Sequence, residues 1–346
     1  MHIPSTGLYP STDAVYTSGS TVRTLTQPTT FALTATGVGG VQTVGTVTVN
    51  VIMENAVHIT YPAPGQLIKR PDTIVQGTVD NIGGDEVGVV VNGVIANVYF
   101  NGANYDFAAN HVPLSSDDSY PIIVAAKSTN DYIATAMITV KADTTGHNVS
   151  LTSNVEFGLT PLDVTLSLAK CTPTSTYSFT YNPNNDSIVN MGDDNTALQF
   201  KRRFTQPGLY YITVDNPETL DDGTIIPHSD KISILAETPQ QFNDRARGKW
   251  SGMTAGLAAG SAADFIKYFG ITTQDKYSTT YNQLMPVLSD VATALQANTI
   301  QFVYLDGNVA KYNITHDEIN NGQPETVIYS IYFIKDMDGL WKIDKF

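Results

Sequence analysis

Cysteine is almost absent from this sequence of 346 residues, in which Cys171 is the single one. No intrachain disulfide can form, so packing alone must stabilise the fold, and we interpret Cys171 as a small residue in or near a strand. Long apolar runs are also missing. Because no stretch approaches the ~20 apolar residues of a membrane span, we expect no transmembrane helix.

Charge is scarce and mostly of one sign. Charged residues make up 15% of the chain, well below the ~25% of ordinary soluble proteins, so Thr, Ser, Asn and Gln must supply the polar surface. The formal net charge of -14 repels phosphate backbones and anionic lipid. Duplex nucleic acid and membrane surfaces are therefore poor candidate partners, whereas cations and neutral polymers remain candidates.

Strand patterns are present from residue 13 to residue 141. Segments alternate or run β-branched, with Gly, Asn, Asp or Pro about every 8–12 residues, which is typical of an all-β sandwich. Asn92-Gly93 between two apolar runs predicts a tight hairpin turn. Low charge with abundant Thr and Val favours the β-sheets of a surface protein over a cytosolic enzyme.

The hydrophobic period changes at Pro239. The spacing of apolar residues predicts one face of a helix that ends at Gly260, made by Phe242, Ala246, Trp250, Met253 and Leu257. Ser261, with Asp264 three residues on, predicts the cap of a second helix. Further helices are expected over 275–284 and 286–295, followed by strands over 299–305, 309–315, 326–334 and 340–346.

These patterns predict a mainly β, multidomain fold of tandem sandwiches followed by a small α+β domain with helices packed on an antiparallel sheet. At ~100 residues per module, the expected parts are a partial module at 1–55, sandwiches at 56–143 and 144–237, and the α+β domain at 238–346. We expect residues 239–346 to fold autonomously while the sandwiches supply length.

Several motifs resemble modules of known families. Residues 57–141 are similar to bacterial immunoglobulin-like (Ig-like) modules of cell-surface proteins, in the opening Thr60-Tyr61-Pro62 and the hairpin Val91-Asn92-Gly93-Val94. Residues 21–52 resemble the second half of such a module. Residues 149–236 resemble a polycystic-kidney-disease-type (PKD-like) sandwich, in the segment 159–166 and in Phe204 to Tyr210, and depart from it in the Asn-rich 181–186. Residues 239–346 resemble a cystatin-like or nuclear-transport-factor-like cone, in 250–253 and 338–343.

Catalytic motifs are missing. The six histidines are scattered without metal-ligand spacing, the glycine-rich segments lack the Lys-Ser/Thr of a phosphate loop, and no Gly-x-Ser-x-Gly elbow occurs. Asp275, His316 and Asp317 are the nearest approach to a titratable set. We therefore expect no enzymatic activity and no cofactor, apart from the calcium considered next.

Oxygen ligands crowd one loop of the third module. The candidate calcium ligands are Asn182, Asn184, Asp186 and Asp193. The alternative is a set of solvated turn residues, and because neutral Asn outnumbers Asp we predict weak or no calcium binding. Asp80, Asp85 and Glu86 form a second acidic group, which we interpret as a solvated hairpin rim.

Two further groups of residues are candidate sites. A cone-shaped domain can enclose a ligand pocket, with Trp250, Tyr268, Tyr312 and Trp341 as candidate lining residues, although a filled aromatic core is the alternative. The N-terminal 52 residues hold about four expected strands, against ~7 in a complete sandwich. A half-sandwich would expose the apolar faces of its strands, and the candidate interface residues are Phe31, Leu33, Val47 and Val49.

The sequence therefore predicts a non-enzymatic, modular extracellular or cell-surface protein with a structural or adhesive role. The expected partner of the N-terminal segment is either the rest of a longer chain or another copy, which would build a fibre by strand addition. Residues 1–4 do not resemble a signal peptide, so either an export signal lies outside this chain or the interpretation as an exported protein is wrong. The alternatives are a carbohydrate-binding accessory region of a secreted enzyme and a ligand-binding C-terminal cone.

Overall fold

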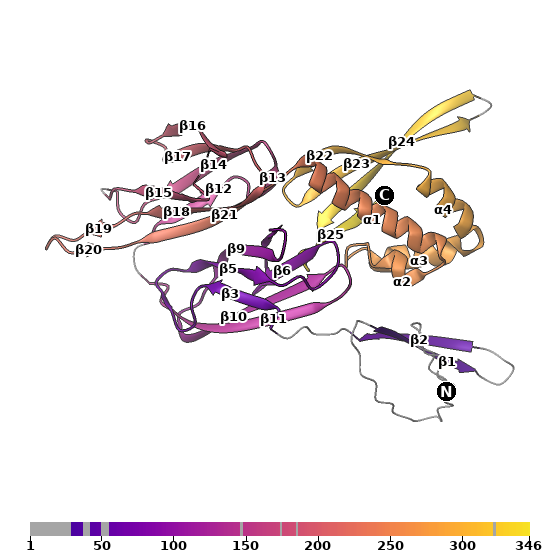
Figure 1. Cartoon of the computed structure of the whole chain (residues 1–346), viewed down its shortest axis with the longest axis horizontal. Helices are drawn as coiled ribbons and strands as arrows, with labels where there is room; N and C mark the ends of the chain where they lie inside the picture. The colour runs from indigo at the N-terminus through magenta and orange to yellow at the C-terminus, as the bar shows by residue number, and fades with distance from the viewer. Residues whose placement is uncertain are drawn as a thin grey trace.

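The structure is a computed structural model that describes residues 29–36, 42–49, 55–145, 148–173, 175–184, 186–320 and 323–346. Two β-sandwiches lie side by side, and a helix-containing domain adjoins both of them at one end (Figure 1). The predicted fold class, mainly β with tandem Ig-like sandwiches before a small α+β domain, is confirmed. Among the described residues no helix is long and apolar enough to cross a membrane.

The first sandwich, residues 57–142, has the strand order of an Ig-like domain. One sheet has the order β3-β5-β9-β8 and the other β4-β11-β10-β6-β7, with β4 parallel to β11. This matches the four-stranded and the G-F-C type sheets of Ig folds. The strands are β3 (Val57–Tyr61), β4 (Leu67–Ile68), β5 (Asp72–Val79), β6 (Val87–Val91), β7 (Val94–Ile95), β8 (Asn97–Phe100), β9 (Tyr105–Pro113), β10 (Asp117–Ser128) and β11 (Ile133–Ala142).

The predicted hairpin turn of this sandwich is confirmed. Asn92 and Gly93 have φ values of +46° and +86° between β6 and β7. Both values lie in the left-handed region that a two-residue turn needs, and Asn and Gly adopt that region at the lowest cost.

The second sandwich, residues 150–237, repeats this arrangement. Its sheets have the orders β12-β14-β17-β16 and β13-β21-β18-β15, with β13 parallel to β21. The Tyr210 hydroxyl donates to the backbone oxygen of Gln206 at 2.8 Å, the tyrosine corner found in Ig folds. The strands are β12 (Ser150–Ser153), β13 (Phe157–Leu159), β14 (Leu162–Ala169), β15 (Ser178–Asn182), β16 (Ile188–Asp194), β17 (Gln199–Phe204), β18 (Gly208–Asp215), β19 (Glu218–Thr219), β20 (Ile225–Ile226) and β21 (Ser229–Glu237).

The C-terminal domain places helices on a four-stranded antiparallel meander of order β22-β23-β24-β25. Helix α1 begins after Thr238, whose side chain accepts from the backbone of Gln241 in a capping box, and its predicted buried face is confirmed. The helices are α1 (Pro239–Ala258), α2 (Ala262–Ile266), α3 (Gln274–Leu284), the 3-10 turn η1 (Met285–Val287) and α4 (Leu288–Gln296). The strands are β22 (Ile300–Asp306), β23 (Val309–Asn320), β24 (Gln323–Lys335) and β25 (Trp341–Lys345).

The N-terminal part of the structure is one antiparallel hairpin of β1 (Thr29–Thr36) and β2 (Gln42–Val49). Neither strand pairs with any other described strand. The register aligns Phe31 with Val47 and Leu33 with Gly45, so the four predicted interface positions share one face of the hairpin. The other strands predicted for residues 1–55 lie outside the described residues.

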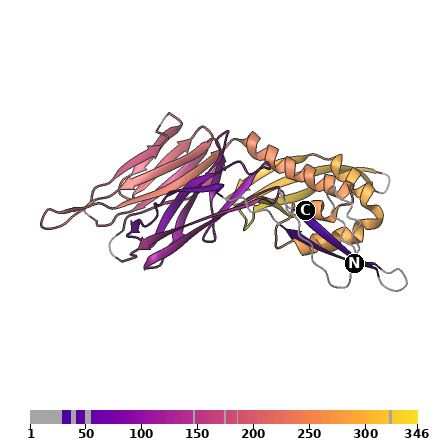
Figure 2. The ribbon, with the colours of Figure 1, turned by 60° about the horizontal axis from the view of Figure 1, so that its bottom comes forward.

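The sandwiches do not form the string that the sequence suggested. Strand β21 packs against β5, β8 and β9 of the first sandwich, so the two lie side by side (Figures 1 and 2). Asn110 donates to the Ser233 oxygen at 2.9 Å and accepts from the Ser233 backbone N–H at 2.7 Å. Arg70 of the first sandwich pairs with Asp230 of the second. The expectation that the sandwiches supply length is therefore wrong, because lateral packing shortens the assembly.

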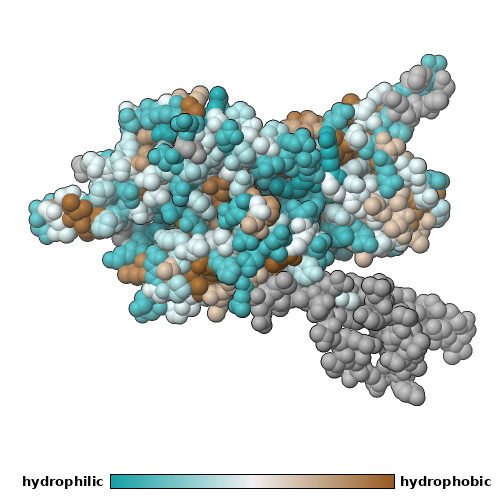
Figure 3. Space-filling model, in the orientation of Figure 1, coloured by the Kyte–Doolittle hydropathy of each residue, from teal (hydrophilic) through white to brown (hydrophobic). Residues whose placement is uncertain are grey.

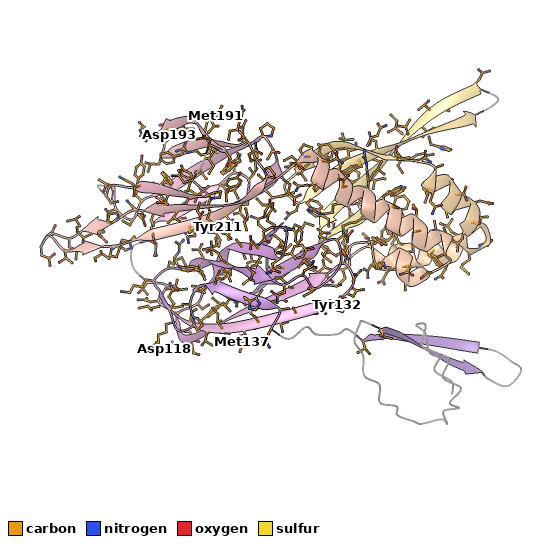
Figure 4. The ribbon with its side chains drawn as sticks, in the orientation of Figure 1. Asp118, Tyr132, Met137, Met191, Asp193 and Tyr211 are labelled. Atoms are coloured by element: carbon orange, nitrogen blue, oxygen red, sulfur yellow. The ribbon has the colours of Figure 1, made fainter. Side chains whose placement is uncertain are left out.

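Tyr211 shows how closely the sandwiches approach each other. It lies on β18 between the two sandwiches (Figure 4), and burial followed by the charge of Asp106 raises the pKa of its hydroxyl. Tyr211 also packs at the margin of a core that continues into the C-terminal domain, where Ile74, Phe157 and Leu235 of the sandwiches join the buried residues around α1. This shared core argues against autonomous folding of residues 239–346, since isolation would expose it.

Candidate functional site

The three domains meet at a cluster of buried charges, which we call the junction. Glu86 immediately precedes β6 of the first sandwich, and Glu237 ends β21 of the second. Arg245 and Lys249 are four residues apart on α1, so both project from one face of that helix. Lys335 ends β24. Each domain therefore contributes at least one charged side chain from the end of a strand or the face of a helix.

The charges are joined by short contacts. Lys249 Nζ lies 2.6 Å from Glu86 Oε2, and Arg245 Nη2 lies 2.7 Å from Glu237 Oε1. Arg245 Nε also approaches Glu86 Oε1 at 3.8 Å, and the backbone N–H of Trp341 donates to the same oxygen at 3.2 Å. Glu86 thus receives contacts from α1 and from β25, which makes it the central acceptor of the junction.

Glu86 corrects one prediction from the sequence. We interpreted it as part of a solvated hairpin rim, but it is 7% exposed and lies against the C-terminal domain. Burial by itself would raise the pKa of Glu86, yet the charges of Lys249 and Arg245 hold it below its ordinary value. Burial would likewise lower the pKa of Arg245, but the charges of Glu237 and Glu86 raise it above its ordinary value. The carboxylate of Glu86 and the guanidinium of Arg245 therefore stabilise each other in their charged forms.

A close backbone approach fixes the domains at this point. A Cβ atom added to Gly88 of β6 would lie 2.2 Å from the Asp338 carbonyl oxygen. Gly339 has φ of +78°, and a Cβ there would lie 2.8 Å from the Val89 nitrogen. Only glycine fits at both places, because any side chain would separate the first sandwich from the turn before β25.

A cleft of about 360 Å³ opens beside the charges. This volume is at the small end of the ~300–1,000 Å³ usual for small-molecule sites. Its walls come from all three domains and include Glu86, Tyr99, Phe100, Glu237, Lys335 and Trp341. The cleft therefore combines aromatic rings with ionisable groups.

Lys335 is the least satisfied cation of the junction. Its ammonium donates to the Ala96 oxygen at 3.0 Å, and in the described part of the chain no carboxylate lies within ion-pair distance of it. Burial lowers the pKa of Lys335 to about 8, although the charges of Glu86 and, less strongly, Glu237 oppose this. The folded protein therefore holds this proton less tightly than an unfolded chain does.

We expect Lys335→Met to stabilise the protein at neutral pH. Below about pH 8 both states keep the proton and the folded state bears the full cost of the buried charge. Between about pH 8 and 10.5 the unfolded state binds more protons, so wild-type stability rises with pH. One pKa unit corresponds to ~1.4 kcal/mol, and the lost hydrogen bond to Ala96 offsets about 1, so the expected gain is about 2 kcal/mol.

Urea unfolding of wild type and Lys335→Met across this pH window tests the expectation. The difference between the two proteins should shrink as the pH rises. The exposed Lys201 of β17 provides the control, since Lys201→Met should leave both the stability and its pH dependence as in wild type. A less stable Lys335→Met protein, or a stability difference that does not change with pH, would contradict the conclusion that burial of the Lys335 charge destabilises the folded protein.

The four predicted pocket residues do not come together at this cleft. Trp341 lines it, whereas Trp250 and Tyr312 are buried in the core of the C-terminal domain and Tyr268 packs against that core. Tyr312 donates from its hydroxyl to Asn243 Oδ1 at 2.8 Å. The aromatic residues of the helix and sheet thus occupy the filled core that was the alternative interpretation.

The predicted calcium ligands lie at the far edge of the second sandwich. Asn182 ends β15, Asn184 and Asp186 follow it, and Asp193 is on β16 (Figure 4). Asp193 is already engaged, since its Oδ1 lies 2.6 Å from Arg202 Nη1. The hydrogen bond from Arg202, opposed by burial, lowers the pKa of Asp193. In the described part of the chain no group of three or more His, Cys, Asp or Glu side chains could hold a metal ion.

We still expect weak or no calcium binding at this loop. Neutral Asn oxygens compensate poorly for dehydration of the ion, and Asp193 would have to leave Arg202. Isothermal titration of the full chain with calcium chloride should show no micromolar site. Micromolar affinity that disappears in Asp186→Ala would overturn this prediction.

The titratable residues considered for catalysis are also spread out. Asp275 lies on α3 and His316 on β23, and within the described residues no hydrogen bond or ion pair joins them. The side chain of Asp317 lies outside the described residues. The junction residues Glu86, Glu237 and Lys335 were not predicted, because they are far apart in the sequence. Only the i, i+4 spacing of Arg245 and Lys249 on an amphipathic helix offered a signal.

Comparisons with known proteins leave the family open. No family model matches, and no curated protein matches. Among solved structures, murine CEACAM1b is 11% identical with a TM-score of 0.18, covering 53% of this chain and 98% of its own. Tandem Ig repeats of Dlar are 11% identical with a TM-score of 0.21, and the match covers 53% of this chain and 98% of theirs. Extracellular cadherin domains 3-6 of protocadherin gamma B2 are 11% identical with a TM-score of 0.19, and the match covers 61% of this chain and 57% of theirs. Likenesses at such TM-scores support no conclusion, so the Ig-like assignment rests on strand order.

Proposed function

We propose that this chain is a non-enzymatic, modular extracellular or cell-surface protein with a structural or adhesive role. In this proposal its two sandwiches and its C-terminal domain act as one rigid unit. The observation that supports it best is the junction, where Glu86 of one domain binds Lys249 and Trp341 of another while Glu237 of the third binds Arg245. Flexible spacers would not need a buried ionic contact at the point where their domains meet.

Other features agree with a structural role. The low charge content and the Ig-like strand order fit a surface protein that presents loops and sheet edges. One such projection is the β19–β20 hairpin, where hydrophobic side chains are exposed at the surface (Figure 3); Leu220 is 39% exposed and Ile225 is 65% exposed. The junction carboxylates are paired with cations instead of standing beside a nucleophile, which supports a role in holding domains together.

Calorimetry and small-angle X-ray scattering of the full chain test the rigid unit. We expect residues 55–346 to unfold in one cooperative transition and to scatter as one compact body. Residues 239–346 expressed alone should lack a cooperative transition, because the core shared with Phe157 and Leu235 would be exposed. An isolated segment that unfolds cooperatively, with a separate transition in the full chain, would refute the proposal.

Assembly through the N-terminal hairpin is the second part of the proposal. Strands β1 and β2 pair with each other and with no other described strand, which leaves backbone edges for strand addition by another copy. Light scattering should detect polymers that grow with concentration and vanish when residues 1–52 are deleted. A stable monomer with protected amides at residues 29–49 would exclude assembly through this edge.

A further inference from the structure

The junction cleft has a cationic end that the protein itself leaves incomplete. The Lys335 side chain is half-buried; its ammonium makes one hydrogen bond, to the Ala96 oxygen at 3.0 Å, and lies 5.9 Å from the centroid of the Phe157 ring. An ammonium has three donors, so donors remain for a group that enters the cleft. Arg245 and Lys249, by contrast, are paired with Glu237 and Glu86. An acceptor brought by a ligand would therefore bind at Lys335.

Aromatic rings form another wall of the cleft. Phe100 is 45% exposed, and its ring is held at 4.9 Å from the ring of Tyr105, with 46° between their planes. Tyr99, the preceding residue of β8, also lines the cleft. A flat, weakly polar ring face would cover Phe100 and remove apolar surface from water. This geometry favours a ligand with a ring over a simple anion.

Polar groups with free hydrogen-bonding capacity surround these rings. Tyr99 and Tyr105 bring hydroxyl groups to the lining of the cleft. Gln241 uses its side-chain oxygen as an acceptor from Thr238, which leaves its amide N–H groups for another partner. Neutral donors and acceptors of this kind match hydroxyl groups. They lie in the same cleft as the free donors of Lys335.

We propose that the junction cleft binds a uronic acid, a pyranose ring that carries a carboxylate. The carboxylate accepts hydrogen bonds from Lys335, one ring face covers Phe100, and the ring hydroxyls bind Tyr99 and Gln241. A cleft of about 360 Å³ suits a single sugar ring. This site is additional to the structural role of the junction, since it uses the donors of Lys335 that its contact with Ala96 leaves free.

Calorimetric titration and saturation-transfer NMR of the full chain test this site. The probes are the methyl glycosides of glucuronic and galacturonic acid, with methyl glucoside and acetate as the neutral and the ringless comparisons. We expect at least one uronide to bind about tenfold or more tightly than methyl glucoside and acetate, because only the uronide combines a charge-assisted contact with a ring face.

Two variants locate the binding. Lys335→Met should reduce uronide affinity by about tenfold or more while the protein stays folded, since that variant is expected to gain stability. Phe100→Ala should give a similar loss, whereas Tyr329→Ala, which removes an aromatic ring of 50% exposure from β24, should leave affinity unchanged. The proposal is wrong if neither uronide binds, if methyl glucoside or acetate binds as well, or if Lys335→Met retains full affinity.

Discussion

Glu86→Ala is expected to destabilise the protein by about 3–5 kcal/mol, the usual cost of removing one partner from a buried ion pair. Lys249 is 3% exposed and would lose its ion-pair partner, while the Trp341 N–H would lose its acceptor. We also expect the single unfolding transition to split, because this carboxylate links the first sandwich to the C-terminal domain. Calorimetry and urea unfolding measure both effects.

Two comparisons separate the ion pair from general damage. The double variant Glu86→Met with Lys249→Met should recover most of the lost stability, since replacing a whole buried pair with apolar residues is often neutral. Asp163→Ala removes the partner of Arg203 from an exposed pair, so it should leave the transition unchanged. A Glu86→Ala protein with wild-type stability would show that the junction contributes nothing to domain coupling.

Trp250→Ala should cost about 3–5 kcal/mol as well, through the loss of a large core side chain. Trp250 is 4% exposed on the buried face of α1, and its ring meets the ring of Phe346 edge to face at 5.5 Å. Alanine would leave a cavity that α1 and the sheet close only in part. Urea unfolding of the full chain gives the size of the effect.

The indole N–H of Trp250 is buried without a hydrogen-bond partner among the described residues. Trp250→Phe should therefore cost much less than Trp250→Ala, because it keeps most of the ring and removes an unsatisfied donor. Tyr304→Ala, at an exposed position of β22, should cost less than ~1 kcal/mol. A cost below ~1 kcal/mol for Trp250→Ala would place this residue at a surface or ligand site instead of in the core.

The hydrophobic period, together with turn and cap residues, was sufficient to predict the local structure. The face of α1 from Phe242 to Leu257, the hairpin at Asn92-Gly93 and the cap at Ser261 are all confirmed. Each of these depends on residues within a few positions of one another, so local sequence contains the needed information. The same holds for the class of fold, since a run of strand patterns followed by helices and a meander permits few architectures.

The tertiary structure alone decided how the domains meet. Sequence spacing suggested sandwiches in a row, but Asn110 and Ser233 pair across 123 residues, and Lys335 reaches Ala96 across 239. Glu86 illustrates the physical reason. An isolated Glu beside Asp85 in a loop is solvated, and it becomes a buried acceptor only when α1 brings Lys249 against it. Local sequence therefore determined the elements, whereas the junction and its cleft exist because long-range packing desolvates charges that complement one another.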